Sequence, residues 1–71
     1  MTISAATKAH VRITAGCGGD ASGNADRAQW AIEHGDLAMA KQSLEWCVEQ
    51  ANLTAAYARQ TLEMLSREGA L

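Results

Sequence analysis

From Leu37 to Glu68 the chain contains neither glycine nor proline, the two residues that most often interrupt a helix. Apolar residues recur through this segment at seven-residue spacing, which places them on one face of a helix. This first stripe consists of Leu37, Leu44, Ala51, Ala58 and Leu65, widened by Val48, Ala55 and Leu62. The pattern predicts a long helix over residues 37–68. A break at 52–54 is the alternative, because Thr54 is a suitable cap for a third helix.

The supply of large apolar side chains limits what such a helix can be packed against. The chain has 71 residues, of which 48% are apolar, but 15 of these apolar residues are alanine. A chain of this length forms one small domain and has difficulty closing a hydrophobic core alone. We therefore expect a small helical protein with more apolar surface than it can bury by itself.

A second, shorter helix is predicted over residues 25–34. Asn24 is a good N-cap, and Asp26 in the first turn complements the helix dipole. Gly35 ends this helix and Asp36 caps the next one, so the two helices are joined by a tight turn. The short helix is expected to cover the first stripe, with contacts from Ala28, Ala31 and Ile32 and with Ala40 and Cys47 at the edge.

Residues 1–24 are predicted to be an N-terminal arm followed by a Gly-rich loop. Four glycines fall within residues 16–24, and their backbone entropy opposes regular structure. Residues 1–15 fit either a short helix capped by Ser4 and ended by Gly16, a short strand, or a poorly ordered arm. The predicted fold is all-α, a hairpin of a short and a long helix, with the arm and loop at 1–24 and the helical domain at 25–71.

A Met/aromatic stripe lies on nearly the opposite side of the long helix from the first stripe: Met39, Trp46, Leu53, Tyr57 and Met64. A helix over 25–34 spans about 15 Å and one over 37–68 about 48 Å, so the short helix leaves half of the long one uncovered. Either the N-terminal segment packs on the Met/aromatic stripe, or the stripe binds a second copy or another protein. Trp30, on the polar side of the short helix, either folds over Arg27, lies under the arm, or contacts a partner.

Charge and cysteine content give the expected surroundings. The net charge is −2, so we do not expect binding to nucleic acid by counterion release. Lys8, His10 and Arg12 interrupt any apolar export signal, and no apolar run is long enough to span a membrane. We expect a cytoplasmic protein with reduced thiols, Cys17 exposed in the loop and Cys47 buried.

The sequence contains no motif that assigns a catalytic, metal or cofactor site. The side chains of Asp20, Ser22, Asn24 and Asp26 resemble the start of an EF-hand calcium loop, but Ala25 and Ala31 stand where that loop needs Gly and Glu. The two His and two Cys lack zinc-ligand spacing. We therefore expect no enzyme, no metal and no cofactor.

The expected function is a non-enzymatic helical protein–protein interaction module. It would be a homodimer that presents Met39, Trp46, Leu53, Tyr57, Met64 and Trp30 to a larger protein partner. A regulator, co-chaperone or inhibitor would fit, including the accessory proteins of phages and mobile elements. The alternative is a small helical module that binds nucleic acid or a ligand through residues 8–27.

Overall fold

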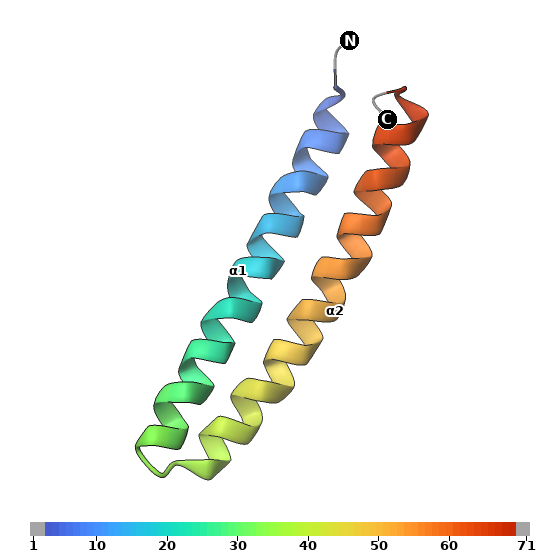
Figure 1. Ribbon diagram of the computed structural model, residues 1–71. Helices are drawn as coiled ribbons and strands as arrows, with labels where there is room; N and C mark the ends of the chain where they lie inside the picture. The colour runs from blue at the N-terminus through green and yellow to red at the C-terminus, as the bar shows by residue number, and fades with distance from the viewer. Residues whose placement is uncertain (1–2, 70–71) are drawn as a thin grey trace.

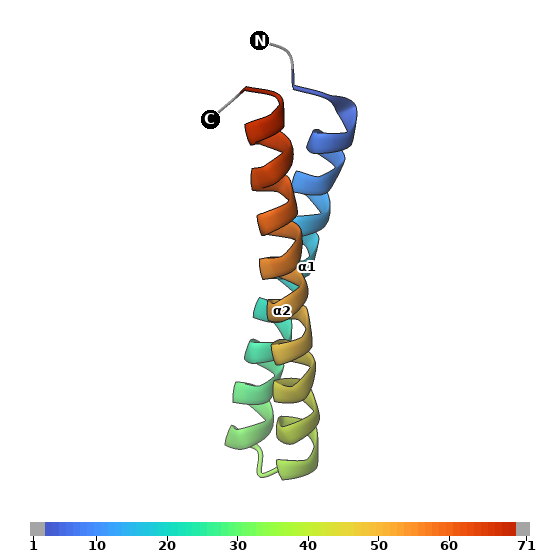
Figure 2. The same ribbon diagram turned by 90° about the vertical axis from the view of Figure 1, so that its right-hand side faces the viewer.

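The computed structural model describes residues 3–69, which form an antiparallel hairpin of two helices. Helix α1 is Ala5–Glu33 and helix α2 is Leu37–Arg67. The helices lie side by side along their whole length, and the start of α1 lies beside the end of α2, opposite the connection (Figures 1 and 2). The all-α helical hairpin predicted from the sequence is confirmed.

The connection between the helices forms as the sequence predicts. Asp36 caps α2, because its Oδ1 accepts a hydrogen bond from the backbone N–H of Met39 at 3.0 Å. Gly35 has a φ of +73°, in the left-handed region where a side chain would be strained. The chain therefore reverses direction within three residues.

Helix α2 continues without a break through residues 52–54. The hydroxyl of Thr54 donates a hydrogen bond of 2.8 Å to the carbonyl of Gln50, one turn earlier, and so does not cap a new helix. Of the two readings of this segment, the single long helix is correct.

Helix α1 differs from the prediction, because it runs through the glycines that we expected to form a loop. Ser4 caps it by accepting a hydrogen bond from the N–H of Thr7 at 3.2 Å, and it continues past Gly16 to Glu33. Asn24 is not an N-cap: its Nδ2 donates to the carbonyl of Asp20 at 3.1 Å, inside the helix. Within residues 3–69, the short helix 25–34, the arm and the Gly-rich loop were therefore wrong, and the boundary that we placed after residue 24 falls within α1. Residues 1–2 of the predicted arm and 70–71 of the predicted helical domain lie outside the described residues.

The helices meet along a line of small and polar residues, which we call the seam. Its members follow alternating spacings of three and four residues, as in a coiled coil, and all are buried or half-buried. Helix α1 contributes Thr7, His10, Thr14, Cys17, Ala21, Asn24, Ala28 and Ala31, and helix α2 contributes Ala40, Ser43, Cys47, Gln50, Thr54, Tyr57, Thr61 and Met64. This pairing explains why the glycines are helical: contacts on both sides of them hold α1 against α2, which offsets a cost of about 1 kcal/mol per glycine.

The seam provides almost no hydrophobic core. The fully buried apolar residues described are Ala28, Ala31 and Ala40, and the fully buried polar ones are Thr7, Ser43 and Thr61. The hydroxyl of Thr61 is satisfied by the carbonyl of Tyr57 at 2.7 Å. Among the described residues, the two helices thus fully bury only small side chains and leave most of the large apolar ones on the outside, with Tyr57 and Met64 half-buried in the seam.

Glu68 joins the two ends of the hairpin and gives a pH-dependent contribution to stability. It accepts hydrogen bonds from the N–H of Ser4 at 3.0 Å and from the hydroxyl of Thr7 at 2.9 Å, and these lower the pKa of Glu68 from its ordinary value of 4.5. A lowered pKa means that the folded state favours the carboxylate, so this contribution is complete above pH 4.5 and is lost as the pH falls through the folded pKa.

We expect the urea midpoint to fall less below pH 4.5 in Glu68→Gln than in the wild type. Equal losses in both proteins would contradict the role of this carboxylate.

Candidate interaction surface

Most of the first stripe of α2 lies at the surface, although the sequence placed it in the core; Ala55, Ala58 and Leu65 are half-buried. The side chain of Leu37 is 69% exposed and that of Val48 is 60% exposed. Ile32, expected to cover the stripe from α1, is itself 57% exposed. The prediction of a core here was wrong, because α1 packs on the small residues of the seam and not on the large apolar ones.

Both helices contribute apolar side chains to the same side of the hairpin, and we call this surface the apolar face. An apolar groove of about 460 Å³ joins the two helices there, with Val11 and Ala15 on α1 and Ala58, Leu62 and Leu65 on α2. Three- and four-residue spacing extends the surface from this groove to the connection. The apolar face consists of Val11, Ala15, Ala25, Ile32, Leu37, Leu44, Val48, Ala51, Ala55, Ala58, Leu62 and Leu65.

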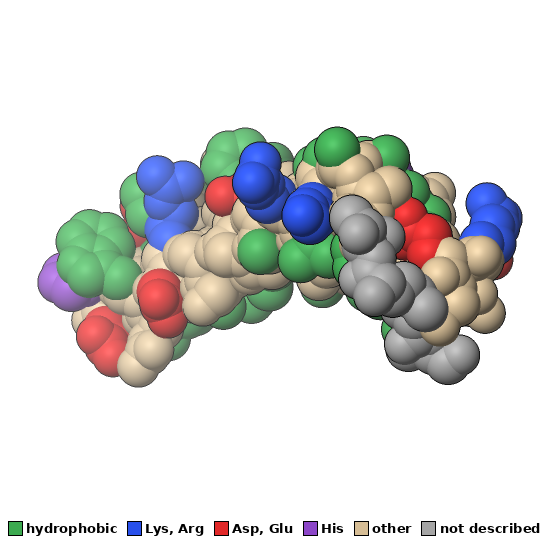
Figure 3. Space-filling view, turned by 90° about the horizontal axis from the view of Figure 1, so that it is seen from above, with side chains coloured by type: hydrophobic (Ala, Val, Ile, Leu, Met, Phe, Trp, Pro, Cys, Tyr) green, Lys and Arg blue, Asp and Glu red, His purple; other side chains and the backbone are tan. Residues whose placement is uncertain are grey.

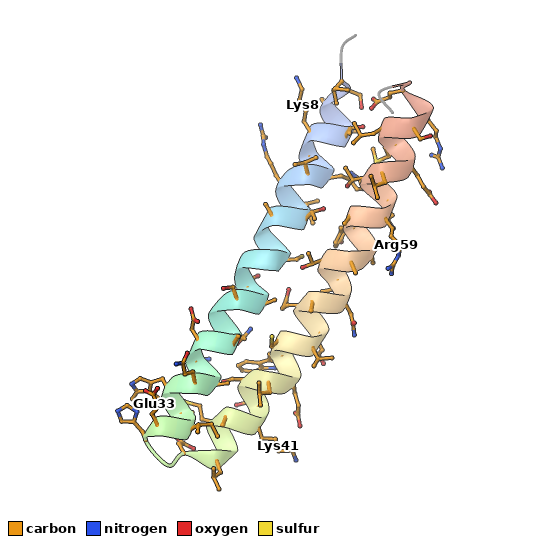
Figure 4. The ribbon with its side chains drawn as sticks, viewed as in Figure 1. Lys8, Glu33, Lys41 and Arg59 are labelled. Atoms are coloured by element: carbon orange, nitrogen blue, oxygen red, sulfur yellow. The ribbon has the colours of Figure 1, made fainter. Side chains whose placement is uncertain are left out.

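Charge is distributed unevenly around the hairpin. The lines of residues that form the apolar face contain no acidic residue within the described part of the chain, and the charged residues in them are Lys8 and Lys41. These two lysines lie near opposite ends of the hairpin, on different helices (Figure 4). Lys41 is highly exposed and paired with Glu45 at 3.8 Å, so its charge stays in solvent. Hydrophobic side chains reach the surface along the length of the molecule in the space-filling view (Figure 3).

The structure divides the Met/aromatic stripe between two environments. Tyr57 and Met64 are half-buried in the seam, where the ring of Tyr57 lies edge-on to His10 with centroids 6.2 Å apart. Met39, Trp46 and Leu53 lie beside the seam, on the side away from the apolar face, and Trp46 is 41% exposed. The five residues are therefore not one exposed surface.

A polar groove of about 630 Å³ surrounds Trp46. It is lined by Asp20, Gly23, Asn24, Arg27, Trp46, Glu49 and Gln50. Acidic, basic and amide side chains are mixed in it, and their described contacts do not converge on one point. Of residues 8–27, to which the alternative function was assigned, Asp20, Gly23, Asn24 and Arg27 line this groove, and Val11, Thr14 and Ala15 line the apolar groove.

Trp30 packs against His34, four residues later in the sequence. Its ring stacks on that of His34, with centroids 4.0 Å apart and an angle of 19° between the planes, at the connection end of the hairpin. Trp30 remains 51% exposed. It is separate from Trp46 and from the apolar face.

The remaining candidate groups are placed as follows. Cys17 and Cys47 are free and both half-buried in the seam, so Cys17 is less exposed and Cys47 less buried than we expected. No group of three or more His, Cys, Asp or Glu side chains within residues 3–69 is arranged to hold a metal ion. Neither of the two helices in that range is long and apolar enough to cross a membrane.

Comparisons with protein-family models, with curated proteins and with solved structures find no match to this chain.

Proposed function

We propose that this chain is a non-enzymatic helical protein–protein interaction module, of the regulator, co-chaperone or inhibitor type. One observation carries the proposal: the hairpin buries alanine, serine and threonine between its helices and leaves Leu37, Leu44, Val48 and Leu62 exposed on one face. Burial of each such side chain contributes about 1.5–3 kcal/mol, and the hairpin alone forgoes most of it.

Two physical arguments support a protein as the missing contact. Soluble monomers rarely expose apolar patches of more than about 300–600 Å², and larger ones mark interaction surfaces. Proteins of this length need many buried Leu, Ile or Trp side chains to be stable without disulfides or metals. The apolar face supplies these side chains but requires a further helical layer to bury them.

The Met/aromatic residues are a second candidate surface. Trp46 and Leu53 are half-exposed, and tryptophan is a favoured anchor in interfaces. This surface is smaller, and it lies beside Asp20, Arg27 and Glu49 in the polar groove. An interaction through it would therefore bury charged groups along with the apolar ones.

Two matched sets of glutamine substitutions test the proposal. Glutamine is a good helix former without charge, so in a self-sufficient hairpin it should preserve or raise helicity at exposed sites. We expect Leu37→Gln, Leu44→Gln, Val48→Gln and Leu62→Gln together to abolish most of the helical circular dichroism. The control set, Ile13→Gln, Trp30→Gln, Trp46→Gln and Leu53→Gln, should retain most of it.

A stable, helical monomer carrying the first set would contradict the proposal. Loss of helix with the control set alone would instead assign the interaction to the Met/aromatic surface.

A further inference from the structure

We propose that the apolar face is covered by a second copy of this chain, packed face to face with its connection at the opposite end, so that two hairpins form a four-helix bundle. This inference rests on the proposed function, because it names the partner of the same module. It commits to one occupant and one orientation.

The dimensions of the hairpin fit this occupant. The backbone extends 52 Å along the hairpin and 15 and 14 Å in the two directions across it. Complete coverage would bury a footprint of about 800 Å² on each copy, which is the usual size for a stable interface between two proteins. A second hairpin has the same length and covers the face from end to end.

The distribution of charge on the apolar face also permits packing against a second copy. A two-fold axis brings the same surface of the two copies together, so a charge on that surface is unpaired unless an opposite charge lies elsewhere on it. The apolar face has no acidic residue among those described, and its charged residues are Lys8 and Lys41, near opposite ends of the hairpin. Lys41 is highly exposed and paired with Glu45 of its own chain. Two copies can therefore meet without bringing carboxylates together, and Lys8 and Lys41 are the charges that the contact must leave in solvent.

The shape of the apolar face selects the relative orientation of the two copies. The groove bounded by Val11, Ala58 and Leu62 lies toward the ends of the chain. Leu37, Leu44 and Val48 are more than half exposed and lie toward the connection. A two-fold axis that reverses the long axis places these side chains over the groove of the other copy, twice per dimer. The axis that keeps both connections at one end would place groove over groove and leave both unfilled.

The first test is the mass of the wild-type chain in solution. At high micromolar concentration we expect twice 7.5 kDa by analytical ultracentrifugation. The thermal midpoint should also rise with chain concentration, because folding and assembly are linked. A monomer would overturn this inference. If that monomer is largely unfolded, the interaction module itself still stands, with a different partner. If it is stably folded and tolerates the first set of glutamine substitutions, both proposals fail.

A matched pair of leucines locates the interface. Leu44 is 51% exposed on the apolar face, whereas Leu53 is 45% exposed on the side away from it, in the same helix. We expect Leu44→Glu to raise the dissociation constant of the dimer by at least about a hundredfold, because the carboxylate would be buried without a partner. Leu53→Glu should change it by less than about threefold. The reverse order of effects would overturn the assignment.

A compensating variant guards against simple misfolding of Leu44→Glu. In the proposed orientation the two α2 helices run antiparallel, and Leu44 of one copy lies beside Leu62 of the other. We expect Leu62→Lys added to Leu44→Glu to recover at least about tenfold of the lost affinity, through a pair between copies. Within one chain these residues are five turns apart and cannot pair. No recovery would overturn this register.

Spin labels measure the orientation directly. In a chain with Cys17→Ala and Cys47→Ala, a label at Glu33→Cys marks the connection end, where Glu33 lies (Figure 4). We expect label-to-label distances of about 45 Å or more, close to the length of the hairpin. Distances below about 25 Å, the width of a bundle, would place both connections at one end and overturn the proposed axis.

Discussion

Replacing Gly16, Gly19 and Gly23 together by alanine is expected to raise the free energy of unfolding by about 2–3 kcal/mol, because each glycine costs a helix interior about 1 kcal/mol relative to alanine. All three lie inside α1 with negative φ. A methyl group at any of them would have no heavy atom within 4 Å beyond the local helix backbone and chain neighbours. Urea unfolding at a fixed chain concentration measures the change.

Gly35 provides the opposite control in the same chain. Its surroundings are equally open, but its φ of +73° is a conformation that a side chain disfavours by about 1–2 kcal/mol. Gly35→Ala should therefore destabilise the protein while the triple substitution stabilises it. If the triple substitution instead lowers stability, residues 16–24 are not helical, and the Gly-rich loop expected from the sequence would be restored.

The parts of the fold that the sequence predicted correctly depend on strong local signals. Asp36 after Gly35 gave the turn, and the absence of glycine and proline from 37–68 gave the length of α2. Ser4 was correctly considered as a cap. Each of these is a property of a few consecutive residues, which is why it could be inferred without knowing the packing.

The full length of α1 was not predicted, because the glycines of residues 16–24 locally disfavour a helix. The contacts that keep this segment helical are made with α2. A signal was present: Thr14, Cys17, Ala21 and Asn24 continue the three- and four-residue spacing straight through the glycines. These residues are small or polar, so they do not contribute to the apolar periodicity that predicts a helix.

The contacts between the helices also decide which residues are buried, and for this reason the predicted buried and exposed faces of α2 were exchanged. Large apolar residues at heptad spacing normally mark a core, so Leu37 and Leu44 were assigned to it. In this hairpin the alanines and threonines of the seam allow the helices to approach closely, and the larger side chains fit only on the outside. Of the predicted interface residues, Tyr57 and Met64 proved to be half-buried in the seam. A single sequence contains both stripes but does not say which one faces the neighbouring helix.

Replacing a buried alanine of the seam by a larger residue should therefore lower the stability of the protein, because the seam has no room for the added atoms. Ala31 is completely buried in the seam, near the connection. Ala31→Leu must either separate the helices or force strained side chains, at a cost of about 1–3 kcal/mol or more, although leucine is an excellent helix former. The urea midpoint at fixed chain concentration is the measurement.

Ala9→Leu is the matched control for this substitution. Ala9 is exposed on α1, away from both the seam and the apolar face. The same added atoms at this position meet solvent, so we expect a change within about 0.5 kcal/mol. A well-tolerated Ala31→Leu would mean that α1 does not pack through Ala28 and Ala31. The helices would then be rotated, with Ile32 and Leu44 between them, and the apolar face would be the core that the sequence first indicated.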